Sequence, residues 1–113
     1  MLTIYHNPRC SKSRETLALL KENTSKEVKV IEYLKDPINE EEIGKLLSML
    51  ACSPIKMMRV KEAEFKEQNL DGADDKTLIS AMVTTPKLIE RPIVTDGNQA
   101  VIGRPPENVL ALC

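Results

Sequence analysis

The 113-residue sequence has no tryptophan and only three aromatic residues, Tyr5, Tyr33 and Phe65. Proteins that hold single-stranded nucleic acid stack its bases on aromatic side chains, so this scarcity argues against such a surface. An excess of one charge is also missing, because 16 lysines and arginines stand against 17 aspartates and glutamates. We therefore expect no nucleic-acid partner, since binding phosphates would need a broad basic face.

Long apolar runs are missing as well. The longest covers only residues 109–113, whereas a helix needs about 20 apolar residues to cross a bilayer. The first residues lead directly into strand-like sequence, without the basic and apolar segments of a signal peptide. These features predict a cytoplasmic protein with no membrane partner.

Residues that build disulfide, metal and cofactor sites are few. The three cysteines, Cys10, Cys52 and Cys113, form an odd set without regular spacing, which favours reduced thiols over a disulfide scaffold. One histidine and four glycines provide neither a metal-ligand constellation nor a dinucleotide fingerprint. The sequence therefore predicts that no metal and no cofactor is bound.

The remaining composition fits one small domain spanning residues 1–113. The chain is 42% hydrophobic, which is enough for a core of its own at this size. Alternation over residues 2–5 predicts a strand, residues 11–23 follow a helical pattern, and the β-branched run 28–33 predicts a second strand. A strand, helix and strand in this order favour parallel pairing of the two strands.

Helical signals dominate the middle of the chain. Asn39 is a suitable N-cap for a helix over residues 40–51, whose first turn is acidic. Pro54 can open a second helix, and Asp74 can cap a third that ends before Pro86. The side chains expected to face inward are Ile55 and Met58 in the second helix and Leu78, Ile79, Met82 and Val83 in the third.

The hydrophobic period changes again near the carboxyl end. Two short strand-like runs, residues 93–95 and 99–102, flank Asp96-Gly97, a dipeptide typical of a tight hairpin turn. Two adjacent prolines then open a last short helix. The predicted fold class is α/β, with a mixed four-stranded sheet and a helical insertion.

Cys10 is the strongest candidate for chemistry, because it lies where the first strand gives way to a helix. Unpaired backbone N–H groups and the helix dipole favour a thiolate at such a position, and they also bind oxyanions. Arg9, Lys12 and Arg14 add the positive charge that lowers cysteine pKa values. A buried and unreactive cysteine is the alternative interpretation.

The other two thiols are expected to be unreactive. Cys52 ends an apolar helix and Cys113 is the final residue, so core packing and a frayed end explain them. Ser13 stands where the second cysteine of a C-x-x-C pair would be. Any reduction at this loop would therefore need electrons from an external thiol.

Four segments of the chain carry a specific family pattern. They are Ile4-Tyr5-His6-Asn7-Pro8-Arg9-Cys10-Ser11-Lys12-Ser13-Arg14 with Thr16-Leu17, then Met57-Met58-Arg59, Glu90-Arg91-Pro92-Ile93-Val94 and Gly103-Arg104-Pro105-Pro106-Glu107. In order and spacing the sequence resembles a short form of the glutathione- and glutaredoxin-coupled arsenate reductases of the ArsC family. The resemblance covers essentially the whole chain and implies a thioredoxin-like fold.

The resemblance also implies a mechanism and its residues. Cys10 would attack arsenate, and glutathione as co-substrate with glutaredoxin would reduce the intermediate to arsenite. The expected roles are oxyanion binding for Arg59, Arg91 and Arg104, thiolate tuning for His6, Ser13 and Arg14, and a cis proline facing Cys10 for Pro92. Nothing in the sequence requires more than a monomer.

Other interpretations stay open. Each arginine could be a surface or ion-pair residue, His6 a structural histidine, and Pro92 an edge-strand proline. A redox-sensing regulator that binds RNA polymerase would share the fold, although Ser13 breaks the C-x-x-C switch such regulators commonly carry. A glutathione-dependent thiol oxidoreductase needs only one cysteine, but it would have no use for three arginines.

Overall fold

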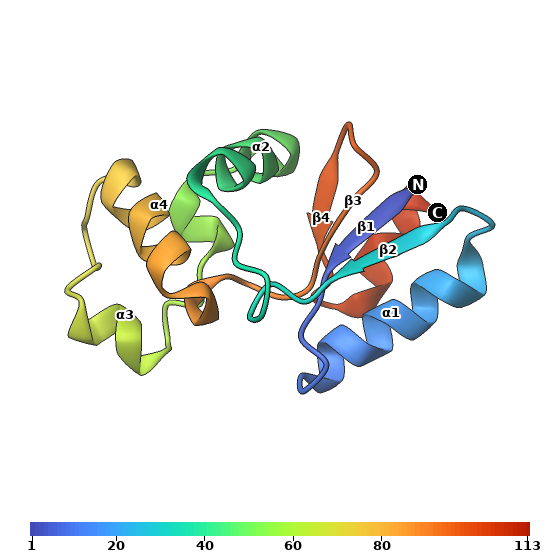
Figure 1. The fold of residues 1–113 in the computed structure, drawn as a ribbon, viewed down its shortest axis with the longest axis horizontal. Coiled ribbons are helices and arrows are strands. Elements are labelled where there is room, and N and C mark those ends of the chain that lie inside the picture. The colour runs from blue at the N-terminus through green and yellow to red at the C-terminus, as the bar shows by residue number, and fades with distance from the viewer. The chain divides into compact units, whose positions relative to one another are not determined.

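A computed structural model describes residues 1–113, and the chain divides into two compact units. The first unit comprises residues 1–36 and 91–113 and holds the whole sheet. Its elements are β1 (Leu2–Tyr5), α1 (Ser11–Asn23), β2 (Val28–Ile31), β3 (Ile93–Thr95), β4 (Ala100–Ile102) and the 3-10 helix η3 (Pro106–Leu112). The strand order is β2-β1-β3-β4 (Figure 1).

The sheet is mixed, as predicted. β1 pairs with β2 in parallel, whereas the β1–β3 and β3–β4 pairs are antiparallel. The parallel pair follows from the intervening helix α1, because a parallel neighbour can be reached only by a crossover connection. β1 is therefore a central strand, and its carboxyl end leads into the loop that carries Cys10.

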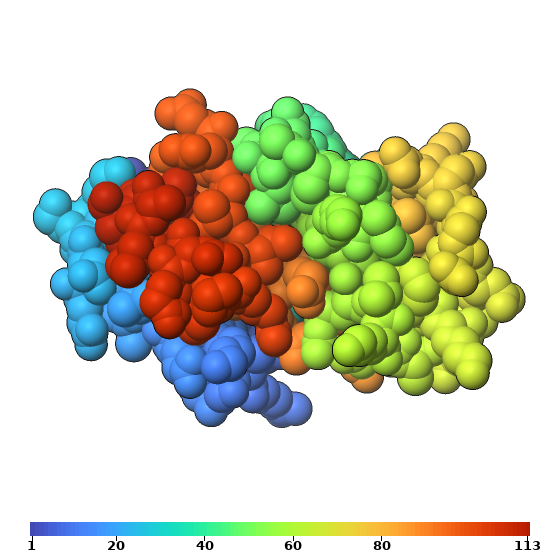
Figure 2. All heavy atoms as spheres, turned by 180° about the vertical axis from the view of Figure 1, so that it is seen from behind, coloured from blue at the N-terminus to red at the C-terminus, as the bar shows by residue number.

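One face of the sheet is covered by α1 and η3. The core cluster on that face consists of Leu2, Ile4, Leu20, Val94, Val109 and Leu112. Leu2 and Ile4 share a face because strand side chains alternate with a period of two. The red spheres of the carboxyl-terminal segment border the blue spheres of α1 in Figure 2, in agreement with the contact between α1 and η3. The core cluster draws residues from both ends of the chain.

The second unit, residues 37–90, is the predicted helical insertion between β2 and β3. Its elements are α2 (Glu40–Leu50), η1 (Pro54–Met57), α3 (Ala63–Glu67), α4 (Asp75–Thr84) and η2 (Pro86–Leu88). Asn39 and Asp74 are N-caps as expected, accepting hydrogen bonds from the backbone N–H groups of Glu42 and Thr77. α4 contacts α2, η1 and η2. None of the helices in the chain combines the length and apolar character that crossing a bilayer requires.

The buried faces of two helices differ from the expected ones. Ile55 is 37% exposed, whereas Met57 and Met58 are buried. The 3-10 helix ends at Met57, and Met58 is an extended residue that forms a β-bridge with Ile89, so Met58 and Ile55 do not share a helical stripe. In α4, Ala81 is buried with Leu78 and Met82, while Ile79 and Val83 are only partly covered.

The hairpin and the second strand also differ in detail. Four residues, 96–99, connect β3 to β4, and only Gly97 has a positive φ, at 98°. The Asp96 carboxylate accepts hydrogen bonds from the backbone N–H groups of Asn98 and Gln99, and these bonds stabilise the longer turn. β2 ends at Ile31 rather than at residue 33, because a turn begins at Glu32. That residues 1–113 act as a single domain remains a prediction.

Candidate active site

Cys10 is the N-cap residue of α1. Its backbone is extended, with φ −95° and ψ 123°, and its carbonyl accepts the Arg14 N–H at 3.0 Å to start the helix. The Cys10 N–H donates to the Asn7 carbonyl at 3.0 Å, which fixes the preceding turn. Its side chain is nearly buried and the cysteine is free. The sulfur is therefore held at the amino end of a helix, where N–H groups are without intrahelical partners.

The surroundings of Cys10 favour the thiolate. Burial is the largest single influence and raises the pKa of the thiol, but the Ser13 N–H, the Arg91 guanidinium and the Lys12 N–H together outweigh it. The pKa of Cys10 is consequently lowered. Because the thiolate is the nucleophilic form of cysteine, the lowered pKa makes this thiol more reactive than an ordinary cysteine.

Two arginines surround the sulfur. Arg104 Nη2 lies 3.7 Å from Cys10 Sγ, and Arg104 Nε donates to the Arg91 carbonyl at 2.9 Å. The Arg91 Nε atom is buried and has no hydrogen-bond partner. A buried donor without a partner is costly, and an oxyanion beside the sulfur would satisfy it. Guanidinium groups suit such an anion because they can donate to two oxygens at once.

His6 and Ser13 form a buried pair beneath the loop. Ser13 Oγ lies 2.7 Å from His6 Nδ1 and accepts the Asn7 backbone N–H at 3.0 Å. Burial lowers the pKa of His6 more than the Glu32 carboxylate raises it, and Arg14 and Lys21 lower it further. His6 is therefore neutral at pH 7, and the pair orders the loop that ends at Cys10 without adding a charge beneath the thiolate.

Arg14 also stabilises the loop. Its Nη1 donates to the Pro8 carbonyl at 3.0 Å, and its charge acts on the pKa of His6. The direct thiolate tuning expected of Arg14 remains a prediction.

Pro92 is buried, and the Arg91–Pro92 peptide bond is cis, as the family resemblance implied. The Arg104–Pro105 bond is also cis.

Arg59 belongs to the second unit, where two carboxylates hold its guanidinium. Nη1 lies 2.6 Å from Glu62 Oε1, and Nε lies 3.7 Å from Glu90 Oε1. Its backbone N–H donates to the Leu88 carbonyl at 2.7 Å. The structure thus groups Cys10 with Arg91 and Arg104 in the first unit, whereas Arg59 is an ion-paired residue of the second.

The two other cysteines have different environments. Burial raises the pKa of Cys52 more than the nearby Lys56 lowers it, so its thiol stays protonated at neutral pH. Cys113 is exposed, and its Sγ donates to the Val109 carbonyl at 3.7 Å. The pKa of the Cys52 thiol is thus shifted in the opposite direction from that of Cys10.

Sequence reasoning missed two residues that hold the site together. A Cβ atom on Gly103 would lie 2.9 Å from Pro92 Cγ and 3.0 Å from Thr16 Cγ2. The Thr16 hydroxyl donates to the Lys12 carbonyl at 2.7 Å and reaches the Gly103 carbonyl at 3.4 Å. The glycine beside Arg104 was the one signal in the sequence, since close backbone approach requires this residue type.

Comparison with known proteins gives a consistent result. The ArsC family model matches residues 5–112. The chain is 45% identical to an arsenate reductase of Haemophilus influenzae over 96% of each chain, and 51% identical to the uncharacterized protein YfgD of Escherichia coli over 96% of this chain and 93% of YfgD.

A solved structure extends the comparison to three dimensions. The arsenate reductase of Vibrio cholerae is 50% identical in sequence and superposes with a TM-score of 0.92. The match covers 99% of this chain and 97% of that one. The predicted thioredoxin-like fold is thereby confirmed. By its sequence, its fold and the family model that spans nearly its whole length, this chain belongs to the ArsC family.

Proposed function

We propose that the protein is an arsenate reductase in which Cys10 is the only catalytic cysteine. The observation that carries the proposal is the Cys10 thiol, whose pKa is lowered and whose sulfur lies beside the Arg104 and Arg91 guanidinium groups. A thiolate next to anion-binding arginines is what attack on an oxyanion requires. The similar proteins of Haemophilus influenzae and Vibrio cholerae that are named arsenate reductases give independent support.

The proposed first step forms a bond between sulfur and arsenic. The Cys10 thiolate attacks pentavalent arsenic, and one oxygen leaves as water once it has taken up protons. Arg91 and Arg104 bind the remaining oxygens and stabilise the charge that develops on them. Arg59 would be a third ligand, which requires its guanidinium to exchange the Glu62 or Glu90 carboxylate for the oxyanion.

Two external thiols would supply the electrons. Glutathione attacks the arsenic bound to Cys10 and releases a second water, so that arsenic carries both sulfurs. The glutaredoxin thiolate then attacks the glutathione sulfur, forming a mixed disulfide and leaving two electrons on arsenic. Hydrolysis releases arsenite and regenerates the Cys10 thiolate. External thiols are needed because Ser13 stands in place of a resolving cysteine in the loop.

The test is arsenate-dependent oxidation of NADPH in a mixture with glutathione, glutaredoxin and glutathione reductase. Wild-type protein should turn over, Cys10→Ser should lose activity at least 1,000-fold because an alcohol replaces the thiolate, and Cys113→Ser should keep most of it. Cys52→Ser should also stay active. An equal loss in Cys52→Ser or Cys113→Ser would contradict the external-reductant scheme.

The same assay separates the alternative functions. A glutathione-dependent thiol oxidoreductase would consume NADPH with a mixed disulfide and show no response to arsenate. A polymerase-binding regulator would respond to neither substrate.

We further propose that the protein works as a monomer in the cytoplasm, where glutathione keeps its three thiols reduced. Sedimentation equilibrium tests the monomer.

A further inference from the structure

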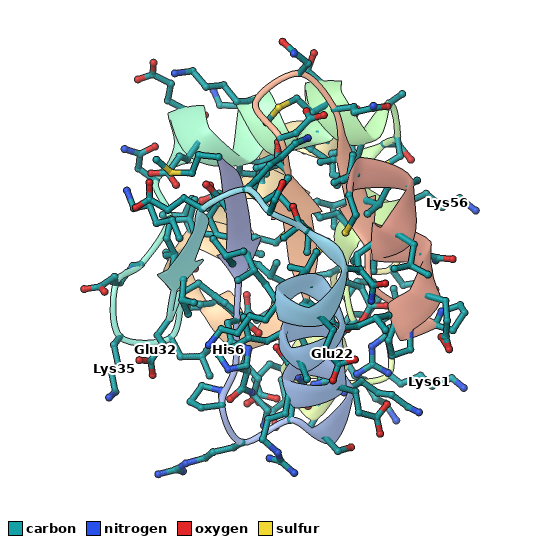
Figure 3. All side chains as sticks on the ribbon, turned by 90° about the vertical axis from the view of Figure 1, so that its right-hand side faces the viewer. His6, Glu22, Glu32, Lys35, Lys56 and Lys61 are labelled. Atoms are coloured by element: carbon teal, nitrogen blue, oxygen red, sulfur yellow. The ribbon has the colours of Figure 1, made fainter.

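A cavity of about 230 Å³ lies beside the loop that carries Cys10. Its two walls come from the first unit and are formed by residues 6–9 and by Glu32, Leu34 and Lys35. In Figure 3 the side chains of His6, Glu32 and Lys35 lie in the same part of the view, with Lys35 pointing outward. The arsenate chemistry at Cys10, Arg91 and Arg104 leaves this cavity unused.

We propose that this cavity binds glutathione, with Arg9 and Lys35 holding its carboxylates and Glu32 holding its ammonium group. The inference rests on the function proposed above, because that function requires a glutathione thiol at the arsenic on Cys10. It deepens that function by assigning the co-substrate to residues outside the anion site.

Charge complementarity is the first argument for this occupant. Arg9 and Lys35 contribute two positive charges and Glu32 one negative charge, while His6 is neutral because burial lowers its pKa. Glutathione carries two carboxylates and one ammonium group, so its charges mirror those of the cavity. Glu32 and Lys35 pair with each other only loosely, at 3.7 Å, with their side chains 37% and 78% exposed. An exposed pair of this kind contributes little and can exchange its partners for those of a ligand.

The walls of the cavity are already ordered, which limits the cost of binding. The Arg9 N–H donates to Asn7 Oδ1 at 3.0 Å, and the His6 N–H donates to the Ile31 carbonyl at 2.8 Å. On the opposite wall the N–H groups of Lys35 and Asp36 both donate to the Glu32 carbonyl at 2.9 Å. A preformed site loses little conformational freedom when it takes up a ligand.

Position is the third argument. The wall formed by residues 6–9 leads directly into Cys10, whose N–H donates to the Asn7 carbonyl. Leu34 adds a side chain that is 47% exposed and can cover the apolar part of a bound peptide. A tripeptide seated here would be held by residues that adjoin Cys10 in the loop, and neither Arg91 nor Arg104 is among them.

Binding can be measured without arsenate by titrating S-methylglutathione into the full chain and following backbone amide shifts by NMR. We expect shifts at residues 6–9 and 32–35, and at least a fivefold weaker affinity for Lys35→Gln and Arg9→Gln. Lys45→Gln, which removes an exposed lysine of α2 paired with Glu41, should bind as wild type. Shifts confined to residues 91 and 104, or equal shifts with glutarate, would overturn the proposed site.

A second measurement separates this inference from the proposed function. In the arsenate assay, Lys35→Gln should raise the KM for glutathione at least fivefold and leave the KM for arsenate within twofold. If the wild type reduces arsenate and Lys35→Gln leaves the KM values for glutathione and arsenate unchanged, the proposed glutathione site is wrong but the proposed function stands. A protein that binds S-methylglutathione at these residues but never reduces arsenate overturns the proposed function.

Discussion

Arg104 illustrates how much of the site depends on side-chain geometry at the scale of one residue. Its guanidinium uses Nε for the Arg91 carbonyl and Nη2 for the Cys10 sulfur. A lysine has one nitrogen on a flexible chain and lacks the rigid, planar pair of nitrogens that these two contacts use. The two contacts therefore distinguish this arginine from a diffuse positive charge.

We predict that Arg104→Lys lowers kcat/KM for arsenate at least tenfold, which is about 1.4 kcal/mol of transition-state stabilisation. Steady-state kinetics in the coupled assay measures it, with Lys45→Arg as a charge-conserving control elsewhere on the surface. Activity of Arg104→Lys close to wild type would show that charge alone suffices at this position.

The position of Cys10 at the start of α1 could be predicted from the sequence, but the contacts of its neighbours could not. Cys10 was identifiable because the local pattern places it between a strand and a helix. The ion pair between Arg59 and Glu90 could not be predicted, since Glu90 is 31 positions away and only folding brings its Oε1 within 3.7 Å of Arg59 Nε. Contacts between distant segments leave no trace in local periodicity.

At the scale of elements, local signals predicted the strands, α1 and the two capped helices well. Asn39 and Asp74 act on N–H groups three residues away, so their roles can be read from neighbouring residues. The burial of Met57 and Met58 could not be read in this way, because it depends on pairing with Ile89 and Glu90, which lie about 30 positions away. The contact of Gly103 with Thr16 depends likewise on how the η3 segment packs against α1.

We predict that Gly103→Ala lowers activity at least tenfold by separating the segment of Arg104 from α1. The new Cβ would meet Pro92 at 2.9 Å and a threonine whose hydroxyl is already hydrogen-bonded. Thus neither neighbour can give way easily. Gly44→Ala is the matched control, because nothing lies within 4 Å of its added methyl group.

Circular dichroism measures whether the variant folds, and the coupled assay measures its activity, so the two effects of the substitution can be told apart. Gly103→Ala should keep its helical signal and lose turnover, together with a rise in the pKa of Cys10 measured by iodoacetamide labelling. Gly44→Ala should match wild type in both measurements. A Gly103→Ala protein that turns over like the control would refute the packing argument.

At the scale of the whole molecule, the stability of the protein should depend on pH through His6. Its pKa in the folded protein lies below the value of 6.5 for an unfolded chain. The unfolded chain therefore binds the proton more readily, so the free energy of unfolding falls as the pH drops below about 6.5. His6 is the only histidine in the chain, so the histidine contribution comes from one residue.

Urea unfolding at pH 7.5 and pH 5.5 measures this dependence. Wild type should be less stable at pH 5.5, and His6→Gln should show a smaller difference between the two conditions. The lowered pKa of Cys10 has the same sign, because stability from a thiolate is lost as the pH falls through its folded pKa. Cys10→Ser serves as the second comparison, and an unchanged difference in His6→Gln would contradict the role given to the histidine.

The central place of β1 has a consequence for how the molecule fluctuates. Strands at the rim of a sheet open first, whereas amides of a strand paired on both sides exchange with solvent only in larger openings. β1 is paired with both β2 and β3, while β2 and β4 are the rim strands. Transient fraying of either rim therefore leaves the strand that leads to Cys10 in place. The proposed nucleophile is attached to the part of the sheet that should exchange its amide hydrogens most slowly.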